Sequence, residues 1–156
     1  EVGLDHYSIY TGVSFNANHY ITGKLTVNST GGGGLGVGFV VRFRTASVDG
    51  YRFVLDHATS NNLEIAKFVS GAHTALVTGT LAPWTDGEFF TFEAVGSLLR
   101  VYRGPWLVAR VKDTTFTSGG GPGMALSGAV TSAAIEDAEV GNLVAATSNR
   151  SYRSQV

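Results

Sequence analysis

The chain has 156 residues, with 11 Lys and Arg against 12 Asp and Glu and a formal net charge of −1. This length fits one domain with its own hydrophobic core, and the near-zero charge argues against a nucleic-acid or anionic-membrane partner. Cysteine is absent, which excludes disulfides and thiolate chemistry, and no apolar run approaches the roughly 18 residues of a membrane-spanning helix.

Strands are predicted wherever apolar residues alternate with small or polar ones between turn residues. They cover residues 5–15 (irregular, interrupted at Gly12), 19–27, 35–45, 50–56, 63–69, 73–77, 88–95, 98–102, 106–111, 124–127 and 133–140. Residues 35–45 form the longest apolar run and are predicted to be a central strand, with Phe39, Val41 and Phe43 on one face. The turns Gly96-Ser97 and Gly104-Pro105 separate three strands of an antiparallel meander.

The connecting segments are rich in turn residues. Residues 28–34 (NSTGGGG) are expected to be a flexible loop, and residues 57–62 a polar turn. No segment keeps apolar residues at helical spacing over three turns. The pattern therefore predicts one all-β domain over residues 1–141, built as a two-sheet sandwich, followed by a polar tail or linker at 142–156.

Several segments carry a resemblance to a known superfamily. They are 38–42 (GFVVR), 51–55 (YRFVL), 84–88 (WTDGE), 99–104 (LRVYRG), 120–123 (GGPG) and 135–141 (IEDAEVG). Their order over about residues 15–141 resembles the concanavalin A-like, or laminin G-like, jelly-roll superfamily. The resemblance implies an antiparallel two-sheet jelly-roll sandwich. It does not fix a function, because lectins, glycan-binding modules, glucanases and phage-tail adhesion domains share this fold.

The glycine-rich, cysteine-free character of the chain is most similar to modules of phage minor tail proteins and secreted bacterial proteins. This implies an extracellular or virion location. Members of the superfamily often open with an extra N-terminal strand, and here the chain begins at Glu1, without Met or a signal-like segment. We therefore expect a processed product or a piece of a longer protein, in which a neighbouring chain could supply that strand.

The carboxylates and histidines do not form a recognisable catalytic pattern. A retaining glucanase of this fold places Glu-x-Asp-x-Glu on one strand face, whereas the chain has Glu136-Asp137-Ala138-Glu139, in which only Asp137 and Glu139 share a face. We interpret these two as solvent-facing. No Gly-x-Ser-x-Gly motif is present, and the four histidines are scattered singly. The sequence predicts no enzyme and no cofactor; calcium is possible in the superfamily but no dense ligand loop predicts it.

Trp106 is the strongest candidate for ligand binding, because it follows a tight turn where its ring could stack on a sugar. The other candidate binding residues are Arg103, Tyr51, Arg52, His57, Asn61 and Asn62. The alternative is that Trp106 packs on the sheet and the asparagines only serve turn geometry. Trp84, between Pro83 and a turn, occupies a position that resembles a buried position of the superfamily, and the resemblance implies that it is core.

These observations favour a non-catalytic extracellular or virion-associated binding and assembly module. Its expected partners are a carbohydrate or cell-surface glycan and neighbouring protein subunits, in a larger assembly or homo-oligomer. One alternative is a structural or decoration subunit with protein contacts only, and a more distant one is a glycoside hydrolase-like enzyme. An open sheet edge would favour assembly, because the strands carry little Lys and no Pro.

Overall fold

The computed structural model describes residues 6–27, 36–56, 61–127 and 133–144. Its strands are β1 (His6–Ile9), β2 (His19–Val27), β3 (Gly36–Arg44), β4 (Asp49–Asp56), β5 (Asn62–Val69), β6 (Ala72–Thr80), β7 (Glu88–Val95), β8 (Leu98–Arg103), β9 (Trp106–Lys112), β10 (Gly121–Ser127) and β11 (Ala133–Asn142). The predicted loop at 28–34, most of the turn at 57–62 and the tail beyond 144 lie outside these ranges.

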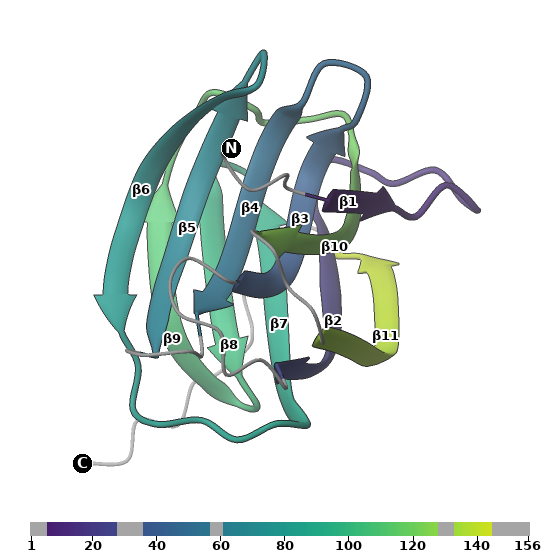
Figure 1. The fold of residues 1–156 in the computed structure, drawn as a ribbon. Helices are drawn as coiled ribbons and strands as arrows, with labels where there is room; N and C mark the ends of the chain where they lie inside the picture. The colour runs from purple at the N-terminus through teal and green to yellow at the C-terminus, as the bar shows by residue number, and fades with distance from the viewer. Residues whose placement is uncertain (1–5, 28–35, 57–60, 128–132, 145–156) are drawn as a thin grey trace.

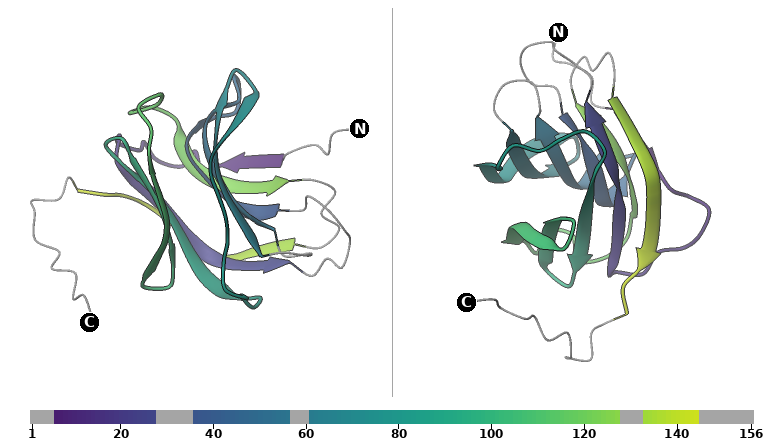
Figure 2. Two further views of the ribbon diagram at one scale, coloured as in Figure 1. Left: turned by 90° about the vertical axis from the view of Figure 1, so that its left-hand side faces the viewer. Right: turned by 90° about the horizontal axis from the view of Figure 1, so that it is seen from below.

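The strands form two antiparallel sheets that lie face to face (Figures 1 and 2). Sheet A has the order β1-β10-β3-β4-β5-β6, and sheet B has the order β11-β2-β7-β8-β9. The meander predicted from the two Gly turns is confirmed as β7, β8 and β9, which are consecutive neighbours in sheet B. The chain is an all-β, antiparallel two-sheet jelly-roll sandwich, as the sequence predicts.

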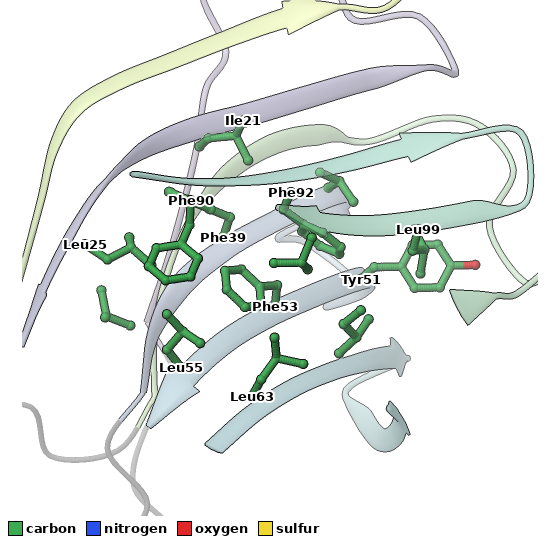
Figure 3. Packing of buried hydrophobic residues seen from close by; sticks show 14 of the residues in the cluster. Ile21, Leu25, Phe39, Tyr51, Phe53, Leu55, Leu63, Phe90, Phe92 and Leu99 are labelled. Carbon is green, nitrogen blue, oxygen red and sulfur yellow. The ribbon is translucent and has the colours of Figure 1, made fainter. Parts of the chain in front are cut away.

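The main core lies between the sheets and is dominated by aromatic rings (Figure 3). Phe53 of sheet A is central, with its ring 6.0 Å from that of Phe90 and 5.9 Å from that of Phe92, both on β7 of sheet B. Trp84 is 3% exposed and meets Phe90 edge to face at 5.7 Å. Its predicted place in the core is confirmed.

A β-bulge in β3 overturns one predicted face assignment. Arg42 has a φ of 52°, and the pairing of β3 with β4 shifts between Val41 and Arg44. Because of the extra residue, Arg42 is fully buried, while Phe43 leaves the face of Phe39 and Val41. Simple alternation therefore placed Phe43 wrongly.

Phe43 belongs to a second hydrophobic cluster, on the outer face of sheet A. The cluster consists of Val40, Phe43, Val54, Ala66, Phe68 and Ala125, with Tyr7, Ile9 and Val48 packed against it. The ring of Tyr7 on β1 lies 5.9 Å from that of Phe68 on β5. In a flat sheet these strands, four positions apart, would be separated by about 19 Å. The outer face of sheet A is therefore concave, and aromatic rings fill its β1 end.

Arg42 and His19 form a network of hydrogen bonds between loops, which we call the Arg42–His19 network. Its guanidinium donates to the Ala17 carbonyl from Nε (2.9 Å) and Nη2 (2.6 Å), and to the Phe116 carbonyl from Nη1 (2.8 Å). Its backbone N–H donates to Nε2 of His19 at 2.9 Å. Since that nitrogen accepts, the proton of neutral His19 is on Nδ1, which donates to the Asn16 carbonyl at 2.8 Å.

The Arg42–His19 network predicts a loss of stability in mild acid. Burial, assisted by the charge of Arg42, lowers the pKa of His19 below its ordinary 6.5 against the opposing Asn16 hydrogen bond. Below pH 6.5 the unfolded chain takes up a proton on His19, whereas the folded chain resists it. The contribution of neutral His19 to the free energy of unfolding is therefore complete above pH 6.5 and declines as the pH falls. One such proton costs up to about 1.4 kcal/mol per pH unit.

Urea unfolding measured at successive pH values tests this prediction. His19→Gln, which keeps a donor and an acceptor but cannot titrate, is expected to flatten the decline below pH 6.5. His6→Gln, which changes an exposed histidine of β1, is the control and should leave the decline in place. An identical pH profile for the wild type and His19→Gln contradicts the assignment.

Candidate functional site

Three polar side chains of neighbouring strands meet on the outer face of sheet A. Arg52 lies on β4, Glu64 on β5 and His73 on β6, and strand alternation brings all three to the same face. Oε1 of Glu64 accepts a hydrogen bond from Nη2 of Arg52 at 3.0 Å and lies 3.0 Å from Nε2 of His73. One carboxylate therefore holds a guanidinium and an imidazole together.

Exposure rises across this cluster from β4 to β6. The side chains of Arg52, Glu64 and His73 are 6%, 25% and 43% exposed. Arg52 is covered because its guanidinium lies 4.9 Å from the ring centre of Phe68, in cation–π geometry. Arg52 is thus a positioning residue, whereas Glu64 and His73 present polar atoms to solvent.

Further polar side chains continue this surface along β5 and β6. Asn62 pairs with Thr80, and Glu64 pairs with Thr78. Oγ1 of Thr80 donates to Oδ1 of Asn62 at 3.3 Å. We call Asn62, Glu64, His73, Thr78 and Thr80 the outer-face strip. It offers a carboxylate, an imidazole, an amide and two hydroxyls beside the apolar floor of the second cluster, a combination suited to a small polyhydroxylated ligand.

The β8–β9 hairpin carries a separate exposed aromatic surface. Trp106 is 73% exposed, and the adjacent Leu107 is 44% exposed. Trp106 therefore does not pack on the sheet, and the alternative of a packed ring is wrong.

Arg103 holds this hairpin in place. Its guanidinium forms an ion pair with Glu88 and donates to the carbonyls of Ala82 (3.1 Å) and Pro83 (2.9 Å). Hydrogen bonding from Arg103 is the main reason why the pKa of Glu88 falls to about 2, and Thr85 contributes further hydrogen bonds. Arg103 thus stiffens the base of the Trp106 surface.

The remaining candidate residues are divided between core and surface. Tyr51 is fully buried on the inner face, where its hydroxyl donates to Asp113 (2.7 Å) and accepts from the Phe116 N–H (2.9 Å). Tyr51 therefore lies in the core, away from both surfaces. Asn61 has a φ of 49° and accepts from the Leu81 N–H at 2.9 Å, which is turn geometry. His57 lies outside the described residues.

Asp113 completes an internal network around Tyr51. Nζ of Lys67 lies 3.2 Å from its carboxylate. Burial would raise the pKa of Asp113, but hydrogen bonds from Tyr51, Thr115 and Lys67 outweigh it and hold the pKa at about 2. This network links sheet A to the segment that follows β9 and is structural.

Sequence reasoning missed Glu64 and His73. Alternation along residues 63–69 places Glu64 on one face of its strand, but only the register of β4, β5 and β6 shows that Arg52 and His73 share that face.

The acidic residues of β11 form surface pairs. Asp137 lies 2.5 Å from Nζ of Lys24, and Glu139 accepts from the hydroxyl of Tyr20 at 2.6 Å. Within the described ranges, no three His, Asp or Glu residues lie close enough to hold a metal ion. In the same ranges, no helix is long and apolar enough to cross a membrane.

Known proteins resemble the chain in structure but not in sequence. No family profile and no curated protein matches its sequence significantly. The carbohydrate-binding module CBM66 from Bacillus subtilis superposes with a TM-score of 0.70 at 18% identity, over 90% of this chain and 83% of that one. Sheep galectin-11 gives a TM-score of 0.58 at 10% identity, over 90% of this chain and 98% of that one.

An enzyme chain also contains a similar domain. The GH43 protein BlXynB from Bacillus licheniformis matches with a TM-score of 0.51 at 14% identity, over 77% of this chain but only 24% of its own length. At such identities the similarity establishes the fold alone. The fold is the concanavalin A-like jelly roll, so the fold that the sequence resemblance implied is confirmed.

Proposed function

We propose that the chain is a non-catalytic carbohydrate-binding module whose site is the outer-face strip. The observation that carries this proposal is the sharing of the Glu64 carboxylate between Arg52 and His73 on a concave sheet face. The fold, which is also that of a carbohydrate-binding module and a galectin, supports it.

The chemistry of the strip matches that of a sugar. Sugar hydroxyls both donate and accept, and a carboxylate accepts strongly from two neighbouring hydroxyls. The hydrogen bond from Arg52 orients Glu64, so fixing the carboxylate costs little entropy on binding. His73, Asn62 and Thr78 supply further donors and acceptors.

Glu64→Gln is expected to weaken glycan binding about 10-fold or more, because a charge-assisted hydrogen bond contributes about 1.5–3 kcal/mol. A glycan array would identify a ligand, and calorimetry would then measure the affinities. His73→Ala is a second variant at a more exposed position, and thermal unfolding would confirm that both variants fold.

Glu93→Gln is the matched control. Glu93 pairs with Arg100 at 2.5 Å on sheet B, so this change also removes a carboxylate from an arginine pair on a strand. It should bind like the wild type. Equal affinities of Glu64→Gln and Glu93→Gln would contradict the assignment to the strip.

The exposed Trp106 favours a second location for the same function. In this version the indole ring stacks on a sugar, and Trp106→Ala abolishes binding while the fold is retained. If Trp106→Ala removes binding and Glu64→Gln does not, the site lies on the hairpin, with Arg103 as its support.

If the array shows no bound glycan, the alternative role as a structural subunit with protein contacts only is favoured. A hydrolase would instead show glycan cleavage that Asp137→Ala or Glu139→Ala removes. The extracellular or virion location remains part of the proposal, supported by the glycine-rich, cysteine-free composition.

A further inference from the structure

The four edge strands of the two sheets differ in their protection against pairing. Sheet A ends in β1 and β6, and sheet B ends in β9 and β11. An edge strand presents unpaired backbone N–H and C=O groups, and proteins usually protect it with charge, proline, bulges or short length. Comparing these features shows which edge is available to a partner.

Three of the edges are well protected. β1 has only four residues. β11 carries Glu136, Asp137 and Glu139 together with a bulge, at which Asp137 has a φ of 50°. β9 carries Arg110 and Lys112, and its pairing with β8 is also shifted by a bulge.

β6 is different. It spans nine residues, AHTALVTGT, without Asp, Glu, Lys, Arg or Pro. It pairs with β5 on one side, and none of the described strands pairs with its other side (Figure 1). Its side chains are exposed except for the partly buried Leu76 and Val77, and its single irregularity lies opposite Ile65 and Ala66. It is a long, uncharged and open edge.

We propose that β6 pairs antiparallel with β6 of a second copy of this chain, about a twofold axis. Antiparallel pairing of one strand with itself is self-complementary, so a single surface supplies both sides of the interface. The small Ala, Thr and Gly side chains allow the backbones to approach, and a net charge of −1 gives little repulsion between copies.

The interface joins the two copies of sheet A into one continuous sheet. Glu64 and His73, on the last two strands before the edge, then lie close to the twofold axis in both copies. The inference does not depend on the proposed function, because it rests on the backbone edge alone.

Sedimentation of the wild type at increasing concentration is expected to show a reversible monomer–dimer equilibrium. Ala75→Lys places like charges near the axis and should give a monomer with an unchanged melting temperature, because Ala75 is exposed. Ala138→Lys is the matched control: it puts the same charge at an exposed alanine of the β11 edge and should dimerise like the wild type.

Cysteine cross-linking locates the interface, since the natural chain has no cysteine. Thr74, Ala75, Thr78 and Thr80 are each replaced by a single cysteine in turn. The variant whose cysteine lies nearest the twofold axis is expected to give disulfide-linked dimers, because there the two Cα atoms come within about 7 Å. Ala138→Cys should give none. A monomer at every concentration, or a dimer insensitive to Ala75→Lys, overturns the proposal. In either case, glycan binding by the strip can be measured separately.

Discussion

Arg42→Met is expected to destabilise the fold by about 3 kcal/mol or more, because hydrogen bonds to a charged group contribute about 1.5–3 kcal/mol each. The substitution leaves the carbonyls of the partly buried Ala17 and Phe116 without the guanidinium that now donates to them. Urea unfolding, followed by the fluorescence of the buried Trp84, measures the loss.

An opposing effect must be weighed, since burying a guanidinium is itself costly. Burial lowers the pKa of Arg42, and removing the charge would recover that cost. The loss of hydrogen bonds should outweigh the recovered desolvation cost. One guanidinium joins the loops at Ala17 and Phe116 to the bulge of β3, and methionine replaces none of these bonds.

Two variants make this result specific. Arg44→Met changes the next arginine of the strand, which is exposed, donates to the Ser118 carbonyl at 3.2 Å and lies 5.9 Å from the Phe116 ring centre, and it should cost little. Arg42→Lys keeps the charge but loses the planar guanidinium with its several N–H donors. It should therefore lose most of the stabilisation that the Arg42 hydrogen bonds provide. If Arg42→Met is as stable as Arg44→Met, the Arg42–His19 network does not hold the loops together.

Gly38→Ala should be at least as damaging. A Cβ at this position would lie 2.0 Å from the Phe53 carbonyl oxygen and 2.9 Å from Cα of Val54, both in the backbone of β4. Backbone in the middle of a sheet cannot move aside without breaking the β3–β4 ladder. We expect a loss of about 3 kcal/mol or more, at or beyond the upper range for overpacking, or failure to fold.

Gly79→Ala is the control, because a Cβ at Gly79 meets no atom within 4 Å and the residue lies on β6 of the same sheet. Its effect on the urea midpoint should be small. Comparable effects of the two alanines would show that the close approach of β3 and β4 at Gly38 does not limit stability.

Local pattern was sufficient to predict most of the strands, although β1 ends at Ile9 and the predicted strand extended to residue 15. Gly96 and Gly104 mark the turns of the meander, and these signals depend on chain neighbours only. Trp84 was expected in the core because its position resembles a buried position of the superfamily. For Trp106, the preceding turn was compatible with both an exposed ring and a packed one, and only the structure shows that the ring is exposed.

The candidate site could not be predicted in the same way. Tyr51 and Arg52 are adjacent in sequence, yet alternation sends the first into the core and the second to the outer face. Which of the two enters the core between the sheets depends on the position of the second sheet. Glu64 and His73 join Arg52 only through strand register, and the bulge at Arg42 has no signature in the apolar pattern.

The second hydrophobic cluster restricts how this face can diversify. At the β1 end, Tyr7, Phe43 and Phe68 are committed to packing, so new side chains there would cost folding free energy. At the β6 end, Thr78, Thr80 and His73 are exposed and free to vary. Random libraries built for new binding specificity should therefore yield folded variants when confined to His73, Thr78 and Thr80 on β6, and mostly unfolded ones when extended to Tyr7, Phe43 and Phe68.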